Sequence, residues 1–65
     1  MLTEIYIEAL LVDEVLADQV WDAWNLGELS DREVLVAWVL VAHYGSRRFR
    51  LIFRIPDGNK SKKSR

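Results

Sequence analysis

Residues 34–42 read VLVAWVLVA, nine apolar residues in succession, and the four residues before them, 30–33, read SDRE. The Ser-x-x-Glu spacing is typical of a capping box, in which the serine hydroxyl and the glutamate each accept a hydrogen bond from the other's backbone amide. A valine-rich run would also suit a buried strand, so the capping box is what favours a helix here. Gly45 stands where this helix should end, and we therefore expect a helix over residues 31–44.

Two further helices are expected upstream of this one. Thr3 can cap a helix over residues 3–11, in which apolar residues recur at spacings of three to five. Asp13 can cap a helix over residues 14–26, and Gly27 follows its last periodic apolar residue. The chain is predicted to be mainly α, with three short helices in a helix-turn-helix-like bundle.

The segment after Gly45 has a different character. Residues 47–55 read RRFRLIFRI, where apolar and basic residues alternate, a pattern that favours a strand over residues 48–55. A helix through Phe49, Ile52 and Phe53, ended by Pro56, is the alternative. From the N-terminus, the predicted organisation is an acidic helical domain over residues 1–45, a basic extended segment and turn over 46–58, and a disordered basic tail over 59–65.

Length and charge restrict the kinds of protein this chain can be. A chain of 65 residues is at most one domain, with a core barely large enough to balance chain entropy. Residues 1–45 carry nine acidic side chains against Arg32 alone, a formal charge of −8, whereas residues 46–65 carry eight basic side chains against Asp57, a formal charge of +7. Such asymmetry is typical of a chain with an anionic partner, or of one whose two halves associate.

Neither catalytic nor cofactor chemistry is suggested by the sequence. Cysteine is absent and His43 is the one histidine, so thiolate metal sites and common nucleophile–base pairs are excluded. We therefore expect no enzyme activity and no catalytic, cofactor-binding or metal-binding residue. Nine apolar residues are fewer than the roughly 20 that a membrane-spanning helix needs, and no basic, apolar leader follows Met1. A cytoplasmic protein without membrane association is expected.

The apolar helix over residues 31–44 suggests a contact surface. A helix that is apolar all round must be buried all round, and two short helices can cover only part of it. Tryptophan and arginine dominate the energetics of interfaces, although packing in the core is the simpler role for Trp21, Trp24 and Trp38. The candidate protein-binding residues are Val34, Trp38, Val41, Phe49, Leu51 and Phe53. The candidate residues for electrostatic attraction of an acidic partner are Arg48, Arg50 and Arg54.

A longer block, residues 6–42, carries a recognisable pattern of YIEALLVD, ADQVWDAW, a glycine-containing turn and an Ala-Trp pair. This block resembles small helical proteins encoded on integrative and conjugative elements of alphaproteobacteria, QseM-like antiactivators among them. The resemblance implies a domain related to helix-turn-helix folds that binds and blocks a transcriptional activator of element transfer. The basic segment from Arg47 onward is not part of the pattern.

These observations favour a small regulator that binds and inhibits a larger protein, such as a transcriptional activator of a mobile element. One alternative is a nucleic-acid-binding accessory protein that makes weak, salt-sensitive contacts through its basic tail. Direct base readout by residues 31–44 is disfavoured, because that helix offers base edges only Arg32 at its acidic start and His43 at its end. The same residues would also suit a symmetric homodimer, or a phage-type inhibitor of a host defence system.

Overall fold

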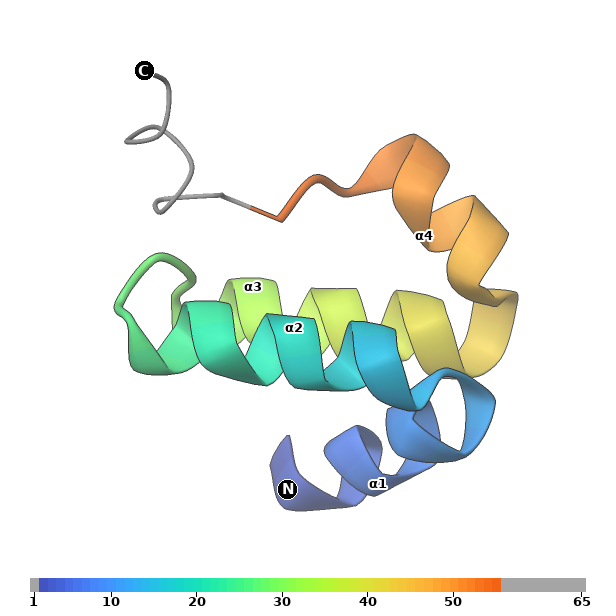
Figure 1. Ribbon diagram of the computed structural model, residues 1–65, viewed down its shortest axis with the longest axis horizontal. Coiled ribbons are helices and arrows are strands. Elements are labelled where there is room, and N and C mark those ends of the chain that lie inside the picture. The colour runs from blue at the N-terminus through green and yellow to red at the C-terminus, as the bar shows by residue number, and fades with distance from the viewer. Residues whose placement is uncertain (1, 56–65) are drawn as a thin grey trace.

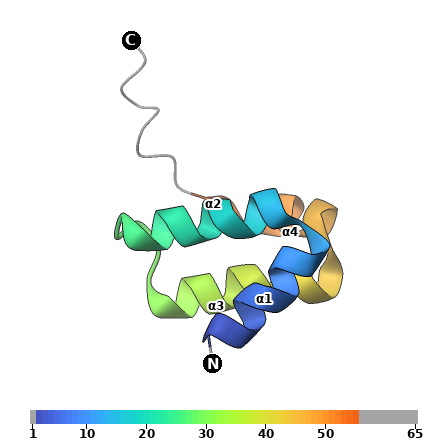
Figure 2. The same cartoon turned by 60° about the horizontal axis from the view of Figure 1, so that its bottom comes forward.

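The computed structural model describes residues 2–55, which form helices joined by short turns (Figure 1). The elements in chain order are α1 (Leu2–Val12), α2 (Glu14–Asn25), α3 (Asp31–Val39), the π-helical turn η1 (Leu40–Tyr44) and α4 (Ser46–Ile52). α2 and α3 lie side by side and run in opposite directions, with α1 against one side of the pair and α4 on another (Figures 1 and 2). The predicted mainly α class is confirmed: within residues 2–55 there are four α-helices and no strand.

The apolar run begins as the capping box predicts. The amide of Glu33 donates to Oγ of Ser30 at 3.2 Å, and the amide of Ser30 donates to Oε1 of Glu33 at 2.8 Å. The helix continues through η1, where the amide of Gly45 donates to the carbonyl oxygens of both Leu40 and Val41 at 3.1 Å. Gly45 has a φ of +93°, which side chains other than glycine rarely adopt, so the helix ends there.

α2 has predictable ends as well. Oδ1 of Asp13 accepts from the amide of Leu16 at 3.0 Å, which is the expected N-cap bond. At the other end, Gly27 has a φ of +81° and the amide of Glu28 donates to the carbonyl of Ala23 at 2.9 Å. This is a Schellman arrangement, and it turns the chain back towards α3 within a few residues.

The strand predicted for residues 48–55 is not formed, and this prediction is wrong. Residues 46–52 are helical, so the extended segment expected over 46–58 is also wrong across that range. The helix is favoured because Phe49 and Phe53, four residues apart, stack with ring centroids 5.1 Å apart and both face the body. The predicted turn after residue 55 and the predicted basic tail over 59–65 lie outside the described residues.

The core is built around Trp38, the largest of the fully buried side chains. Every helix contributes to it, and the alanines at positions 9, 17, 23 and 37 are almost wholly buried, which lets the helix backbones approach closely. Across residues 2–55, no helix combines the length and the hydropathy that crossing a bilayer would require.

Candidate interaction surface

The three residues of the apolar run that are predicted as anchors do not lie on the surface. Val34, Trp38 and Val41 are each 0% exposed. They recur at spacings of four and three residues, so they form one stripe of the helix, and α1, α2 and α4 enclose that stripe. Nε1 of Trp38 also donates to the carbonyl of Ala17 at 3.2 Å, which fixes the indole inside the domain. Their prediction as contact residues is therefore wrong for this fold.

Part of the same run does remain uncovered, as expected for a helix that is apolar all round. Val36, on the opposite side of α3 from Trp38, is 45% exposed, and Leu35, at the flank of the buried stripe, is 38% exposed. The covering helices are indeed too few to enclose the run, but the side chains they leave exposed are not the predicted ones.

α4 divides the remaining candidates between core and surface. Phe49 is buried and Phe53 is partly buried against the core, so neither is a free contact residue. Leu51 is 77% exposed, and its neighbour Ile52, which the helical alternative groups with Phe49 and Phe53, is 62% exposed. The helical period explains this division, because Leu51 lies two residues from each phenylalanine and therefore on the other side of the helix.

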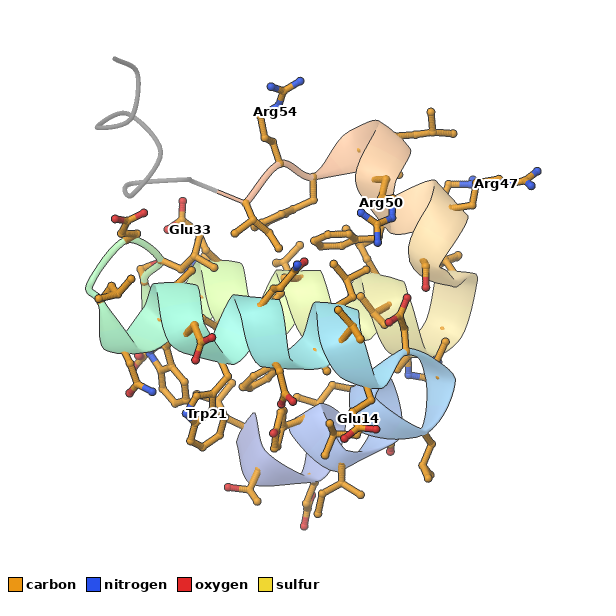
Figure 3. The ribbon with its side chains drawn as sticks, in the orientation of Figure 1. Glu14, Trp21, Glu33, Arg47, Arg50 and Arg54 are labelled. Atoms are coloured by element: carbon orange, nitrogen blue, oxygen red, sulfur yellow. The ribbon has the colours of Figure 1, made fainter. Side chains whose placement is uncertain are left out.

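Four arginines lie in the same segment as these two apolar side chains. The predicted Arg48, Arg50 and Arg54 are exposed, and so is Arg47. Arg47 and Arg54 project away from the helical body in Figure 3. Within residues 2–55, none of these arginines lies within 4 Å of a carboxylate oxygen. We define the α4 surface as Arg47, Arg48, Arg50, Leu51, Ile52 and Arg54.

The start of α4 is tied to the body by Asp13. Its Oδ2 accepts from the hydroxyl of Ser46 at 2.5 Å while its Oδ1 caps α2. The hydrogen bond from Ser46, and next the bond from the amide of Leu16, lower the pKa of Asp13 below its usual 3.8. One carboxylate thus joins the α1–α2 corner to α4, which limits how freely the α4 surface can move.

A second group of apolar side chains is exposed, and none of its members is among the contact residues predicted from the sequence. Leu11 is 83% exposed, Val12 is 48% exposed and Val15 is 66% exposed, all at the corner between α1 and α2. The sequence carries a signal for this group: Leu10 and Leu11 are adjacent, so a single helix can turn only one of them towards the core. Leu10 is the one that packs inward.

On the α1 side of the molecule, aromatic rings form a cluster. Trp21 lies 4.7 Å from Tyr6, 5.6 Å from Trp24 and 6.0 Å from Trp38 between ring centroids. Nε1 of Trp24 donates to Oδ1 of Asp31 at 2.9 Å, which couples α2 to the first turn of α3. Trp38 is core as the simpler interpretation predicts, whereas Trp21 and Trp24 remain partly exposed.

His43 lies beside Glu8 on the surface. Its Nε2 lies 3.6 Å from Oε1 of Glu8, and both side chains are more than half exposed, so the pair adds little stability. No group of three or more histidine or carboxylate side chains within residues 2–55 could hold a metal ion.

Comparison with known proteins adds no relative: no family model, no curated protein and no solved structure matches this chain.

Proposed function

We propose that this chain is a non-enzymatic protein–protein interaction module that regulates a larger protein by binding it through the α4 surface. One observation supports the proposal above the others. Phe49 of α4 is held in the core, while Leu51 and Ile52 of the same seven-residue helix stand 77% and 62% exposed among four arginines. A short helix fixed by one face and apolar on the other is suited to docking.

The composition of the α4 surface fits the energetics of protein interfaces. Complete burial of a leucine or isoleucine side chain contributes about 1.5–3 kcal/mol. Arginine is enriched at interface hot spots, and exposed charges around the apolar centre accelerate encounter with a partner of opposite sign. The region 46–55 carries four arginines and no acidic residue, so the matching partner surface is acidic with an apolar depression.

The partner class follows from the resemblance of residues 6–42 to element-encoded antiactivators. A transcriptional activator of a mobile element is the proposed target, and occupation of its surface would block transcription of transfer functions. The apolar α3 is occupied with the core. Contact with the partner is therefore assigned to α4.

The proposal is tested by affinity capture from the native host with the wild type and two variants. Leu51→Glu places a carboxylate at the centre of the α4 surface. Leu11→Glu places the same charge on an equally exposed leucine, 83% against 77%, at the α1–α2 corner. We expect one protein to be recovered in a one-to-one ratio by the wild type and Leu11→Glu, and to be lost with Leu51→Glu. Equal recovery by both variants would refute the assignment to α4.

Nucleic-acid binding is a second candidate, favoured by the four exposed arginines that have no carboxylate within 4 Å in residues 2–55. If all four contacted phosphates, affinity for duplex DNA would fall by about two orders of magnitude between 50 and 200 mM salt. Fluorescence anisotropy with a labelled duplex measures this slope. A wild type that does not bind at 50 mM salt would exclude this candidate.

A further inference from the structure

Beside the aromatic cluster lies a surface whose charge is opposite to that of the α4 surface. Tyr6 donates its hydroxyl hydrogen to Oδ1 of Asp18 at 2.7 Å. The pKa of Tyr6 is raised above 10.0, first by this hydrogen bond, and the negative charges of Asp18, Glu14 and Asp22 all contribute. The three carboxylates recur every four residues along α2 and so share the side of the helix on which Asp18 binds the Tyr6 hydroxyl.

The aromatic part of this surface is open to a ligand. Trp21 lies between Asp18 and Asp22 on α2, its ring centroid is 4.7 Å from that of Tyr6, and it is partly exposed. Its Nε1 donates no hydrogen bond to any other residue of the described chain. We define the acidic–aromatic surface as Tyr6, Glu14, Asp18, Trp21 and Asp22.

The two surfaces face different sides of one molecule. Figure 3 shows Trp21 and Glu14 on the α1 side of α2, and Arg47 and Arg54 on the α4 side. α1 and α4 also lie on different sides of the α2–α3 pair in both ribbon views (Figures 1 and 2). The complementary charges of the two surfaces therefore cannot meet within one copy as it is folded here, but they can meet between copies.

We propose that the chain associates head to tail, with the α4 surface of one copy bound to the acidic–aromatic surface of the next. Three carboxylates face four basic side chains in this contact, so the charges nearly balance. All four basic residues of region 46–55 are arginines. A guanidinium can pair with a carboxylate in a bidentate manner and stack on the ring of a tryptophan or tyrosine, which a lysine does less well. The occupant of the acidic–aromatic surface is thus a second copy of this chain.

Such a contact has a recognisable physical signature. Different patches meet, so every bound pair still presents one free surface of each kind, and further copies can add. The attraction is largely electrostatic, and the Debye length falls from about 30 Å at 0.01 M salt to about 3 Å at 1 M. Self-association goes beyond the proposed function because it requires no other protein. An acidic partner would compete with self-association for the α4 surface.

Two double variants of the full chain each remove one surface. Glu14→Lys/Asp22→Lys reverses charge on the acidic–aromatic surface and leaves the Tyr6–Asp18 hydrogen bond in place. Arg47→Glu/Arg54→Glu cancels the formal charge of the α4 surface and spares Arg50, whose charge acts on Asp13. Arg32→Glu is the control, since Arg32 is an exposed arginine in the first turn of α3 and belongs to neither surface.

Sedimentation velocity at 10 mM salt measures the mass of each sample, and near-UV circular dichroism of the tryptophans confirms folding. We expect the mass of the wild type and of Arg32→Glu to increase with concentration and to return to that of the monomer at 1 M salt. Each double variant alone should stay monomeric, and an equimolar mixture of the two should associate, because the intact α4 surface of one variant meets the intact acidic–aromatic surface of the other. Three results would each overturn the proposal: a wild type that stays monomeric, an increase of mass with concentration in either double variant alone, or a mixture that stays monomeric.

Discussion

The substitution Phe49→Ala tests whether α4 is part of the folded domain. Phe49 is 2% exposed and its ring stacks on Phe53 at 5.1 Å. Removal of a buried phenylalanine side chain costs about 3–5 kcal/mol. A helix of seven residues is far below the roughly 12–15 residues at which an isolated helix becomes marginally stable. We therefore expect α4 to melt when this contact is lost.

The matched control for this variant is Leu51→Ala in the same helix. Leu51 is 77% exposed, so its truncation should change stability by less than about 0.5 kcal/mol. Hydrogen exchange provides the assay, because the amide of Phe53 donates to the carbonyl of Phe49 at 2.8 Å and should be protected only while α4 is formed. Phe49→Ala should abolish that protection. Equal protection in both variants, or an equal loss, would show that Phe49 does not anchor the helix.

Three further predictions concern caps and titrating groups. Ser30→Ala removes one bond of the capping box and should cost about 0.5–2 kcal/mol, measured as a lower melting temperature than that of Ser30→Thr. The pKa of Asp13 is lowered in the folded state by the hydrogen bond from Ser46, so the ionised carboxylate stabilises the fold above about pH 4, and this stabilisation is lost as pH falls through the folded pKa. When each protein is compared with its own stability at pH 7, the wild type should therefore begin to lose stability in acid at a higher pH than Asp13→Asn. The pKa of Tyr6 is raised chiefly by its hydrogen bond to Asp18, so the protonated hydroxyl stabilises the fold below pH 10, and this stabilisation is lost as pH rises through the folded pKa. Absorbance titration at 295 nm should show Tyr6 ionising at a lower pH in Asp18→Asn than in the wild type.

Local signals in the sequence are sufficient to place most helix ends. The capping box at residues 30–33, the cap at Asp13 and the glycines at 27 and 45 all do in the structure what their chemistry predicts. These signals are reliable because each depends on a few neighbouring residues and on backbone groups that must find partners.

The sequence is less informative where two periods overlap. The segment RRFRLIFRI satisfies a period of two through its alternation and a helical period through Phe49 and Phe53. Tertiary contact decides between them, because only the helix brings the two rings within stacking distance of each other while both pack on the body. The formation of α4 in turn buries Phe49 against η1, while α1 and α2 enclose Trp38 of α3. The candidate surface predicted there is therefore part of the core.

The sequence predicts which types of residue form the candidate surface, but not which of the candidate residues are exposed. Arg48, Arg50, Arg54 and Leu51 are exposed as a contact surface requires, whereas Val34, Trp38 and Val41 are not. Their spacing of four and three residues is the spacing of a core stripe. The acidic–aromatic surface could not be foreseen, because it joins Tyr6 to α2 across a pair of packed helices.

Whether α4 or α3 is the contact helix is decided most directly by two charge insertions. Leu51→Glu and Val36→Glu each place one carboxylate at an exposed apolar position, 77% and 45% exposed, and both variants should fold. Loss of a central contact residue typically costs about 2 kcal/mol or more, roughly a thirtyfold loss of affinity. In affinity capture from the native host, we expect Leu51→Glu to lose the partner and Val36→Glu to retain it at the wild-type level. Retention by Leu51→Glu together with loss by Val36→Glu would assign the contact to α3 instead.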